Sequence, residues 1–263
     1  MTHLRHLGIF DSGIGGLTVV RELLRRSPET SFTYLGDTAR VPYGNKSPDT
    51  IRLFAQQDVA FLVERGVTDV IIACNTVSAH ALESLRARFP MLRFYEVISP
   101  AVRLALRHPS PIGVIGTRAT ILANIYATRI HEENPLAIVY SVSCPLFVPL
   151  VEEGWIRHPE TKRIARRYLA PLKQKQIRTL MMGCTHYPLL SSVIRASLPK
   201  RTVLIDTPSA LWDEIMVKDP SLLQPLQGIV KQEYYFTDLS PQTREMTQRW
   251  LGHPVMCHLA ELK

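Results

Sequence analysis

Residues 69–82, DVIIACNTVSAHAL, and residues 178–191, RTLMMGCTHYPLLS, share one pattern. In each stretch a short apolar run leads to a small residue, a cysteine and a polar pair, and then to a segment with helical character. A short apolar run that stops in this way is typical of a buried strand of a parallel sheet followed by a helix. The cysteines of the two stretches are Cys74 and Cys184.

A second pair of stretches repeats in the same order. Residues 7–20, LGIFDSGIGGLTVV, and residues 112–125, IGVIGTRATILANI, each predict a strand, then a hydroxyl residue, then a helix. The hydroxyl residues are Ser12 and Thr117. Both pairs are separated by nearly the same number of residues, which indicates an internal duplication. We therefore expect two similar α/β domains, each with one hydroxyl loop and one cysteine loop.

Apolar runs that predict strands alternate with amphipathic stretches along most of the chain. The expected strands are residues 7–10, 31–35, 69–73, 112–115, 137–142, 178–182, 202–205 and 233–236. The expected helices are residues 17–26, 48–64, 76–88 and 119–131, and Ser47 followed by Pro48 predicts a capped start for the second helix. This alternation predicts an α/β fold with largely parallel sheets and helices on both faces. Residues 219–231 break the alternation and predict an irregular connection.

Composition limits the class of protein. The chain has 263 residues, 46% of them hydrophobic, which allows one large domain or two of ordinary size. No apolar run approaches the roughly 20 residues that span a bilayer, and the first residues lack a signal-peptide pattern, so we expect a cytoplasmic protein. The net charge is +8, but the basic residues are scattered and not interleaved with aromatic residues. Nucleic acid is therefore not expected as a partner, and a solvated basic surface or steering of an anionic substrate explains the charge.

Four cysteines occur without metal-ligand or redox-pair spacing, at positions 74, 144, 184 and 257. Cys144 and Cys257 have no partner motif, so we expect them to be core thiols. If the two domains face each other, Cys74 and Cys184 lie on opposite sides of one cleft. Helix N-terminal amides favour a thiolate at such positions. Two thiols so placed suit proton removal from one face of a carbon and proton return to the other, without a metal or cofactor.

Other polar residues in these loops are candidates for the same site. The hydroxyls of Ser12, Thr76, Thr117 and Thr185, with nearby helix amides, are suited to hold a carboxylate or another small anion. Asp11 precedes Ser12 and is a candidate neighbour of Cys74, although a loop or cap role is the alternative. His186 is a candidate proton relay for Cys184, and a helix-start cap is its alternative.

Other functions on an α/β fold have weaker support. DSGIGG resembles a glycine-rich nucleotide loop but lacks the dinucleotide spacing and the P-loop lysine. Pyridoxal phosphate requires a Schiff-base lysine, and Lys46 is the only lysine inside a motif. A binding protein that keeps the fold without catalysis remains open.

Six motifs together resemble the glutamate racemases of the aspartate/glutamate racemase family, with a racemase of aspartate or another amino acid on the same fold as the alternative. They are GIFDSGIGGLTV, YLGDTARVPYGNKS, IIACNTVSA, VIGTRAT, CPLFVPLVEEG and LMMGCTHYPLL, and they cover roughly residues 7–206 in the family's order. The resemblance implies two flavodoxin-like, doubly wound domains facing each other across an active-site cleft. The implied division is residues 1–98 with 208–263, against residues 99–207. Two departures stand out: Val77 replaces a common alanine, and residues 208–225 lack the usual regular helical pattern.

The resemblance also implies a function and a set of site residues. The implied reaction is cofactor-independent interconversion of L- and D-glutamate, which supplies D-glutamate for peptidoglycan. Cys74 would act on the D-enantiomer and Cys184 on the L-enantiomer. The implied assisting residues are Asp11, His186, Asp37 and Glu152. The implied substrate contacts are Asp11, Ser12, Pro42, Tyr43, Gly44, Asn75, Thr76, Thr117 and Thr185. A homodimer and binding of DNA gyrase are further properties compatible with the resemblance.

Overall fold

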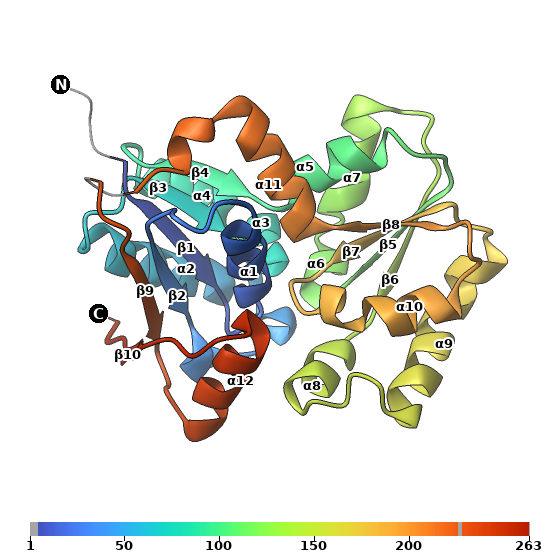
Figure 1. Cartoon of the computed structure of the whole chain (residues 1–263). Coiled ribbons are helices and arrows are strands. Elements are labelled where there is room, and N and C mark those ends of the chain that lie inside the picture. The colour runs from blue at the N-terminus through green and yellow to red at the C-terminus, as the bar shows by residue number, and fades with distance from the viewer. Residues whose placement is uncertain (1–4, 226–227, 263) are drawn as a thin grey trace.

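Two parallel sheets organise the part of the chain that the computed structural model describes, residues 5–225 and 228–262 (Figure 1). The first sheet has the strand order β10-β9-β2-β1-β3-β4. Its strands are β1 (Leu7–Asp11), β2 (Phe32–Gly36), β3 (Asp69–Ile72), β4 (Arg93–Glu96), β9 (Gln232–Phe236) and β10 (Cys257–Leu259). The second sheet has the order β6-β5-β7-β8. Its strands are β5 (Ile112–Gly116), β6 (Val139–Ser143), β7 (Thr179–Gly183) and β8 (Val203–Asp206).

The predicted strands are confirmed, with ends shifted by at most two residues. The sequence did not predict β4 and β10, which are the edge strands of the first sheet. The segment RFYE of β4 and the segment CHL of β10 are partly exposed and carry polar residues, so neither reads as an apolar run. All strand pairs are parallel, and the central orders β2-β1-β3-β4 and β6-β5-β7-β8 correspond strand for strand.

The helices agree with the sequence in part. Helix α1 (Leu17–Arg26) has the predicted bounds, and α2 (Pro48–Val63) starts where Ser47 Oγ accepts a hydrogen bond from the Thr50 amide at 3.3 Å. The single helices predicted for residues 76–88 and 119–131 are wrong, because each is two helices. The first consists of α3 (Asn75–His80) and α4 (Leu82–Arg88), and the second of α6 (Arg118–Leu122) and α7 (Ile125–Glu133). Asn124 breaks the second with a left-handed backbone, φ +53°, which asparagine tolerates better than most residues.

Further helices complete the two layers around each sheet. They are α5 (Ile98–Ala105), α8 (Phe147–Glu152), α9 (Pro159–Gln174), α10 (Ser191–Ser197), α11 (Thr207–Lys218) and α12 (Pro241–Leu251). Alternate strand residues face opposite layers: Ile9 belongs to the core on the α1 side, whereas Phe10 belongs to the core beneath α2. The larger core is continuous between the sheets, since it joins Ile9 to Val114 and Leu180.

The result is a mixed α/β fold with parallel sheets, as predicted. Among the described residues, none of the helices has both the length and the apolar character needed to cross a membrane. The division into two domains, residues 1–98 with 208–263 and residues 99–207, stays a prediction. Residues 1–4 and 263 of the first domain lie outside the described part of the chain. The first part of the stretch that departs from the family pattern, residues 208–218, lies in the regular helix α11 (Thr207–Lys218).

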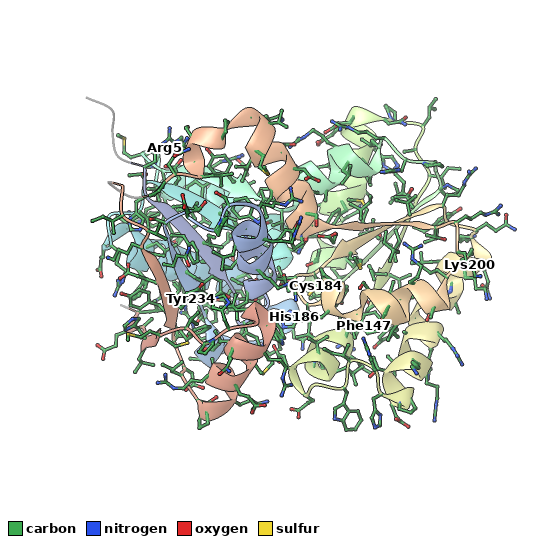
Figure 2. The ribbon with its side chains drawn as sticks, viewed as in Figure 1. Arg5, Phe147, Cys184, His186, Lys200 and Tyr234 are labelled. Atoms are coloured by element: carbon green, nitrogen blue, oxygen red, sulfur yellow. The ribbon has the colours of Figure 1, made fainter. Side chains whose placement is uncertain are left out.

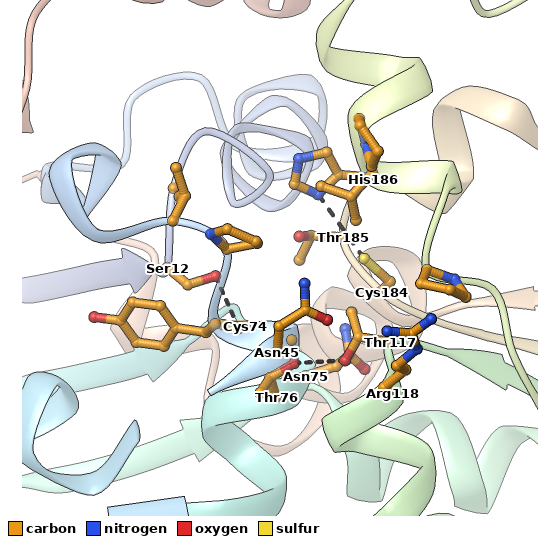
Figure 3. A pocket seen from close by; sticks show the side chains of 18 of the residues that line it. Ser12, Asn45, Cys74, Asn75, Thr76, Thr117, Arg118, Cys184, Thr185 and His186 are labelled. Atoms are coloured by element: carbon orange, nitrogen blue, oxygen red, sulfur yellow. Dashed lines mark hydrogen bonds between the residues drawn. The ribbon is translucent and has the colours of Figure 1, made fainter. Parts of the chain in front are cut away.

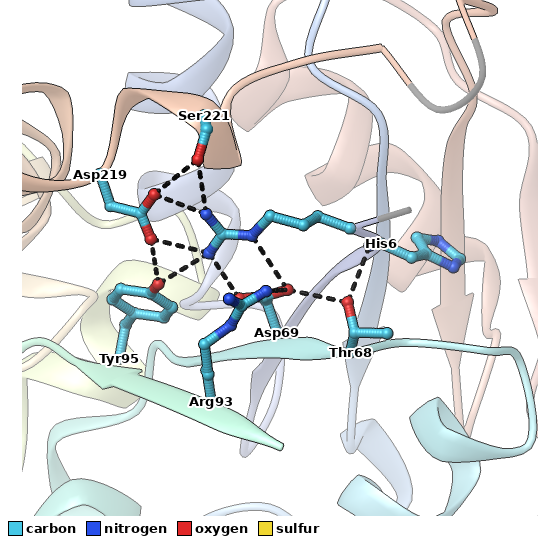
Figure 4. Close-up of polar contacts among 8 residues, drawn as sticks. His6, Thr68, Asp69, Arg93, Tyr95, Asp219 and Ser221 are labelled. Carbon is cyan, nitrogen blue, oxygen red and sulfur yellow. Dashed lines mark hydrogen bonds and ion pairs between the residues drawn. The ribbon is translucent and has the colours of Figure 1, made fainter. Parts of the chain in front are cut away.

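The irregular connection predicted for residues 219–231 is anchored to the first sheet by a polar network (Figure 4). Its described part contains one short 3-10 helix, Pro220–Leu222, and residues 226–227 lie outside the described part. Arg5 Nη2 donates to Asp219 Oδ2 at 2.7 Å and to the buried Asp69 Oδ1 at 2.6 Å. Arg93 Nε adds a hydrogen bond to Asp69 Oδ1 at 2.7 Å. Arg5, which precedes β1, therefore supplies the positive charge that joins Asp219 of this connection to Asp69 at the start of β3.

We predict that Asp69→Asn lowers the free energy of unfolding by about 3 kcal/mol, because it removes the charged partner of a largely buried ion pair. Burial raises the pKa of Asp69, but hydrogen bonds from Arg5 and Arg93 outweigh it and leave the pKa below its usual value. The contribution is therefore complete above the ordinary aspartate pKa of about 3.9 and disappears as the pH falls through the lowered value. Urea unfolding of both proteins at neutral and acidic pH measures the difference.

The matched control is Arg93→Gln, because this arginine is 56% exposed and Arg5 still neutralises Asp69 without it. We expect that change to cost less than about 1 kcal/mol. Equal losses for the two variants, or a loss for Asp69→Asn that is independent of pH, would contradict the assignment.

Candidate active site

One cavity of about 510 Å³ opens at the carboxyl ends of the central strands of both sheets. In each sheet the chain reverses its winding direction around the central pair, β1 and β3 or β5 and β7, which is where open α/β sheets bind ligands. Ser12, Cys74, Thr117 and Cys184 follow these four strands and line the cavity (Figure 3). Figure 2 shows Cys184 and His186 near the middle of the molecule, between the two sheets.

The structure brings most of the predicted site residues into this cavity. Those that line it are Ser12, Pro42, Tyr43, Gly44, Cys74, Asn75, Thr76, Thr117, Glu152, Cys184, Thr185 and His186. Asp11 and Asp37 do not line it, although both contact residues that do. Cys144 is a buried thiol and Cys257 is partly buried, and neither lines this cavity.

Cys74 occupies the position between β3 and α3 and is almost completely buried. Its Sγ lies 3.2 Å from Ser12 Oγ. Burial raises the pKa of Cys74 to about 12, the negative charge of Asp11 adds to that rise, and the Ser12 hydroxyl opposes it. At neutral pH Cys74 is therefore a thiol, with the proton available for transfer.

Cys184 has a different electrostatic environment, because the hydrogen-bonded pair of His186 and Glu152 lies beside it. Cys184 Sγ lies 3.8 Å from His186 Nδ1, and His186 Nε2 lies 3.0 Å from Glu152 Oε1. Burial lowers the pKa of His186, but the contacts with Cys184 and Glu152 outweigh burial and raise the pKa to about 10. The imidazole is therefore a cation at neutral pH. No α-helix starts directly after Cys184: a 3-10 helix, Tyr187–Leu190, precedes α10.

Asp11 lies buried between the two cysteine loops, at the end of β1. Its Oδ1 accepts from Thr185 Oγ1 at 3.4 Å, and its Oδ2 accepts from the Gly13 amide at 3.1 Å. Burial raises the pKa of Asp11, and the charge of His186 opposes that rise. Asp11 thus influences the charge of both cysteine loops from below the cavity surface.

Gly15 allows the first hydroxyl loop to approach the second cysteine loop closely. A Cβ at this position would lie 2.5 Å from His186 Cε1 and closer still to Thr185 Oγ1, so only glycine fits. Thr18 Oγ1, on α1, reaches across and lies 2.9 Å from the Thr185 carbonyl oxygen. This approach sets the spacing of the two halves of the cavity.

Hydroxyls and one amide join the remaining cavity loops. The Oγ1 atoms of Thr76, Thr117 and Thr120 lie 3.0 Å from one another. Asn75 Oδ1 accepts from the Tyr126 hydroxyl at 2.5 Å. These contacts connect the start of α3 with α6 and α7, so the helix after Cys74 is held by elements of the second sheet.

Asp37 lies behind the cavity wall. Its carboxylate accepts from Arg40 Nε at 2.6 Å, from Thr237 Oγ1 at 2.7 Å, and at very short range from the Tyr43 hydroxyl. Tyr43 lines the cavity and Asp37 does not. Asp37 therefore acts on the site through Tyr43 in this structure, and its predicted catalytic role stays untested.

The sequence did not single out several residues that the structure adds to the site. Arg118, Pro145, Leu146, Val148, Pro149 and Tyr168 also line the cavity. The proline and aliphatic residues belong to the motif CPLFVPLVEEG, so a signal existed for them, whereas Tyr168 lies on α9 outside any motif. Trp250 packs edge-to-face against His186, with ring centroids 5.5 Å apart. It lies on α12, and no local pattern connects it with the site.

Comparisons with known proteins agree with one another. Residues 16–215 match the family model described as Asp/Glu/Hydantoin racemase. The glutamate racemase of Persephonella marina is 42% identical over 259 residues, 98% of this chain and 96% of that protein. The glutamate racemase of Trichodesmium erythraeum is 46% identical over 207 residues, 78% of this chain and 76% of that protein. The crystal structure of Francisella tularensis glutamate racemase in complex with D-glutamate superposes with a TM-score of 0.90 at 36% identity, covering 98% of this chain and 97% of that one.

We predict that Glu152→Gln lowers the pKa of His186 from about 10 towards its usual value, because the neutral amide removes one source of the rise. A group whose pKa rises on folding stabilises the protein fully below its unfolded pKa and loses that contribution as the pH rises through the folded value. The variant should therefore lose stability below about pH 6.5, with the difference shrinking towards pH 10. NMR titration of the imidazole measures the pKa directly.

The control is Glu153→Gln, because Glu153 is the exposed neighbour of Glu152. An unchanged His186 titration in Glu152→Gln would contradict the electrostatic coupling of Glu152 to His186.

Proposed function

Because the chain belongs to the Asp/Glu/Hydantoin racemase family, we propose that it interconverts L- and D-glutamate by two-cysteine proton transfer. The observation that carries the proposal is the convergence of Cys74 and Cys184, one from each sheet, on a single cavity. The glutamate racemases of Persephonella marina and Trichodesmium erythraeum support the choice of glutamate.

The unequal surroundings of the two thiols assign them opposite starting roles. We assign Cys184 the part of the base, because its Sγ lies 3.8 Å from Nδ1 of His186, an imidazole that can carry a proton to or from it. Cys74 keeps its proton because burial and Asp11 disfavour its charged form. The resting enzyme is thus prepared to deprotonate the L-enantiomer through Cys184 and to protonate the opposite face through Cys74.

The proton balance closes over one turnover. The Cα–H bond breaks as a new S–H bond forms on Cys184, and the S–H bond of Cys74 breaks as a new Cα–H bond forms on the other face. The enzyme is left with Cys184 as thiol and Cys74 as thiolate, which is the starting form for the reverse reaction. Return to the resting form requires proton exchange with solvent, for which His186 and Glu152 form a path beside Cys184.

The polar lining of the cavity suits a small dicarboxylate. Ser12, Thr76, Thr117 and Thr185 supply hydroxyls, and Asn75 supplies an amide. Arg118 and the protonated His186 supply positive charge to the lining of the same cavity. We assign the substrate carboxylates to these groups, and Tyr43 with Gly44 to the wall beside the side chain.

The cellular role follows from the reaction. D-glutamate made by this enzyme supplies peptidoglycan synthesis, and we place the enzyme in the cytoplasm, where L-glutamate is available. A homodimer is the oligomeric state we propose to test alongside activity.

We predict that Cys74→Ser and Cys184→Ser each lower the rate of racemisation by at least about 10³-fold, because each removes one obligatory acid–base group. Circular dichroism of L-glutamate, D-glutamate and both aspartate enantiomers, incubated with each protein, follows the reaction. Cys144→Ser is the matched control, since Cys144 is equally buried but does not line the cavity. Near-normal turnover by Cys184→Ser would exclude the two-thiol mechanism, and faster turnover of aspartate would exclude glutamate as the preferred substrate.

We also predict that racemisation in deuterium oxide places deuterium on the α-carbon of the product enantiomer, since the donating thiol exchanges with solvent. NMR or mass spectrometry of the recovered glutamate measures the incorporation. Inversion with full retention of the original α-proton would point to a different route.

A further inference from the structure

A turn beside the cavity is held by two fully buried carboxyl groups that share one arginine. The turn is the 3-10 helix Tyr43–Asn45, all of which lines the cavity. Behind it lie Asp37 and Asp58, neither of which is exposed to solvent. Asp58 lies on α2 and was not singled out by any sequence motif.

The charges in this cluster do not balance if both carboxyl groups are ionised. Arg40 donates through Nε to Asp37 Oδ2 at 2.6 Å and through Nη2 to Asp58 Oδ1 at 2.9 Å. Its Nη1 donates to the neutral Gln57 side chain. One guanidinium against two buried carboxylates leaves a buried negative charge, which is costly in a site of low dielectric constant. A proton on one carboxyl removes that cost.

The hydrogen-bond count identifies the carboxyl that carries the proton. The Tyr43 hydroxyl contacts Asp37 Oδ2 at very short range and Asp58 Oδ2 at 3.2 Å, but it has only one proton to donate. Asp37 already accepts from Arg40 and Thr237, as expected for an ionised group. Asp58 Oδ2 has only the Tyr43 oxygen as its partner in the described structure, so a proton on Asp58 completes the network.

The titration behaviour of the groups agrees with this count. Burial raises the pKa of Asp58 well above its usual value, the charge of Asp37 raises it further, and Arg40 opposes the rise. Burial also raises the pKa of Tyr43, so the phenol keeps its own proton. The resulting chain runs from Asp58 O–H to the Tyr43 oxygen, and from the Tyr43 O–H to the Asp37 carboxylate.

We infer that Asp58 is a positioning residue for the reaction: as a neutral carboxylic acid it donates to Tyr43 and holds the Tyr43–Asn45 turn against the cavity. The turn has little freedom on its other side, because a Cβ at Gly44 would lie 2.7 Å from Thr117 Cβ. A turn released from Asp58 therefore shifts relative to Thr117, and the cavity changes shape. Asp58 acts through Tyr43 and does not line the cavity itself.

The test compares Asp58→Asn, Asp58→Ala and Asp37→Asn. An asparagine side chain reproduces a protonated aspartate, because its oxygen accepts from Arg40 and its NH₂ donates to Tyr43. We expect Asp58→Asn to keep KM for glutamate within about threefold of the wild type. We expect Asp58→Ala to raise KM by about 10- to 100-fold, since displacing a positioning group has effects of that size.

Asp37→Asn leaves Arg40 without its buried counter-charge and should lower the urea midpoint of unfolding far more than Asp58→Asn does. Asp49→Asn, an exposed change on the same helix, is the control.

A spectroscopic measurement tests the proton directly. The infrared difference spectrum between wild type and Asp58→Asn should contain the C=O stretch of a protonated carboxyl group, which the Asp49→Asn difference spectrum lacks. Absence of that band, or an Asp58→Asn protein as impaired as Asp37→Asn, would overturn the inference. So would a folded Asp58→Ala protein with unchanged KM.

If Asp58→Ala does not fold, the urea midpoints of Asp58→Asn and Asp37→Asn decide whether Asp58 is the neutral carboxyl group. The KM measurements rest on the proposed racemisation of glutamate, whereas the infrared and unfolding measurements do not. A wild-type protein that fails to racemise glutamate would therefore refute the proposed function. The infrared and unfolding measurements would still decide whether Asp58 is protonated.

Discussion

The close approach of Gly15 to Thr185 and His186 is the contact on which the site depends. Each sheet alone would present one cysteine loop and one hydroxyl loop at its carboxyl edge. The absence of a side chain at Gly15 lets the first loop pack directly against Thr185 and His186 of the second. The Thr18 contact with the Thr185 carbonyl and the continuous core between the sheets hold that arrangement.

Cys74 and Cys184 follow equivalent strands, β3 and β7, but the groups around the two thiols differ. Cys74 is paired with a hydroxyl and lies near the buried Asp11, which keeps its proton on. Cys184 lies beside a histidine that Glu152 keeps protonated. The duplication thus supplies two similar loops, and the neighbours of each loop give the two thiols different surroundings. Trp250, from the C-terminal helix, packs against the histidine and extends that asymmetry beyond the duplicated part.

The buried polar clusters away from the thiols show two ways of neutralising a carboxyl group. Asp69 is ionised, because Arg5 and Arg93 both donate to it and leave no charge deficit. Asp58 shares its single arginine with Asp37, and a proton takes the place of the missing cation. The first cluster anchors a connection at the far edge of the sheet, and the second supports the cavity wall at Tyr43.

Repetition along the chain was enough to predict the central strands, their parallel sheets and the shared cavity of Cys74 and Cys184. A strand that is buried on both faces is encoded as a local run of apolar residues, which can be recognised in the sequence. The edge strands β4 and β10 were not predicted, since a partly exposed strand has no such apolar run. The helix breaks at Ala81 and Asn124 were not predicted, because they depend on the backbone angles of single residues, which the pattern of apolar residues does not specify.

The sequence by itself determined which residues meet in the cavity: the two cysteines, the hydroxyls that follow neighbouring strands, and His186. Tertiary structure alone decided which residues stand behind them. Tyr168 lines the cavity from α9, whereas Asp58 and Trp250 contact lining residues from α2 and α12 without lining it themselves. Asp37, which was predicted for the site, lies behind the cavity wall. The physical reason is that a side chain's charge and contacts depend on groups brought near by folding, which no local pattern of residues encodes.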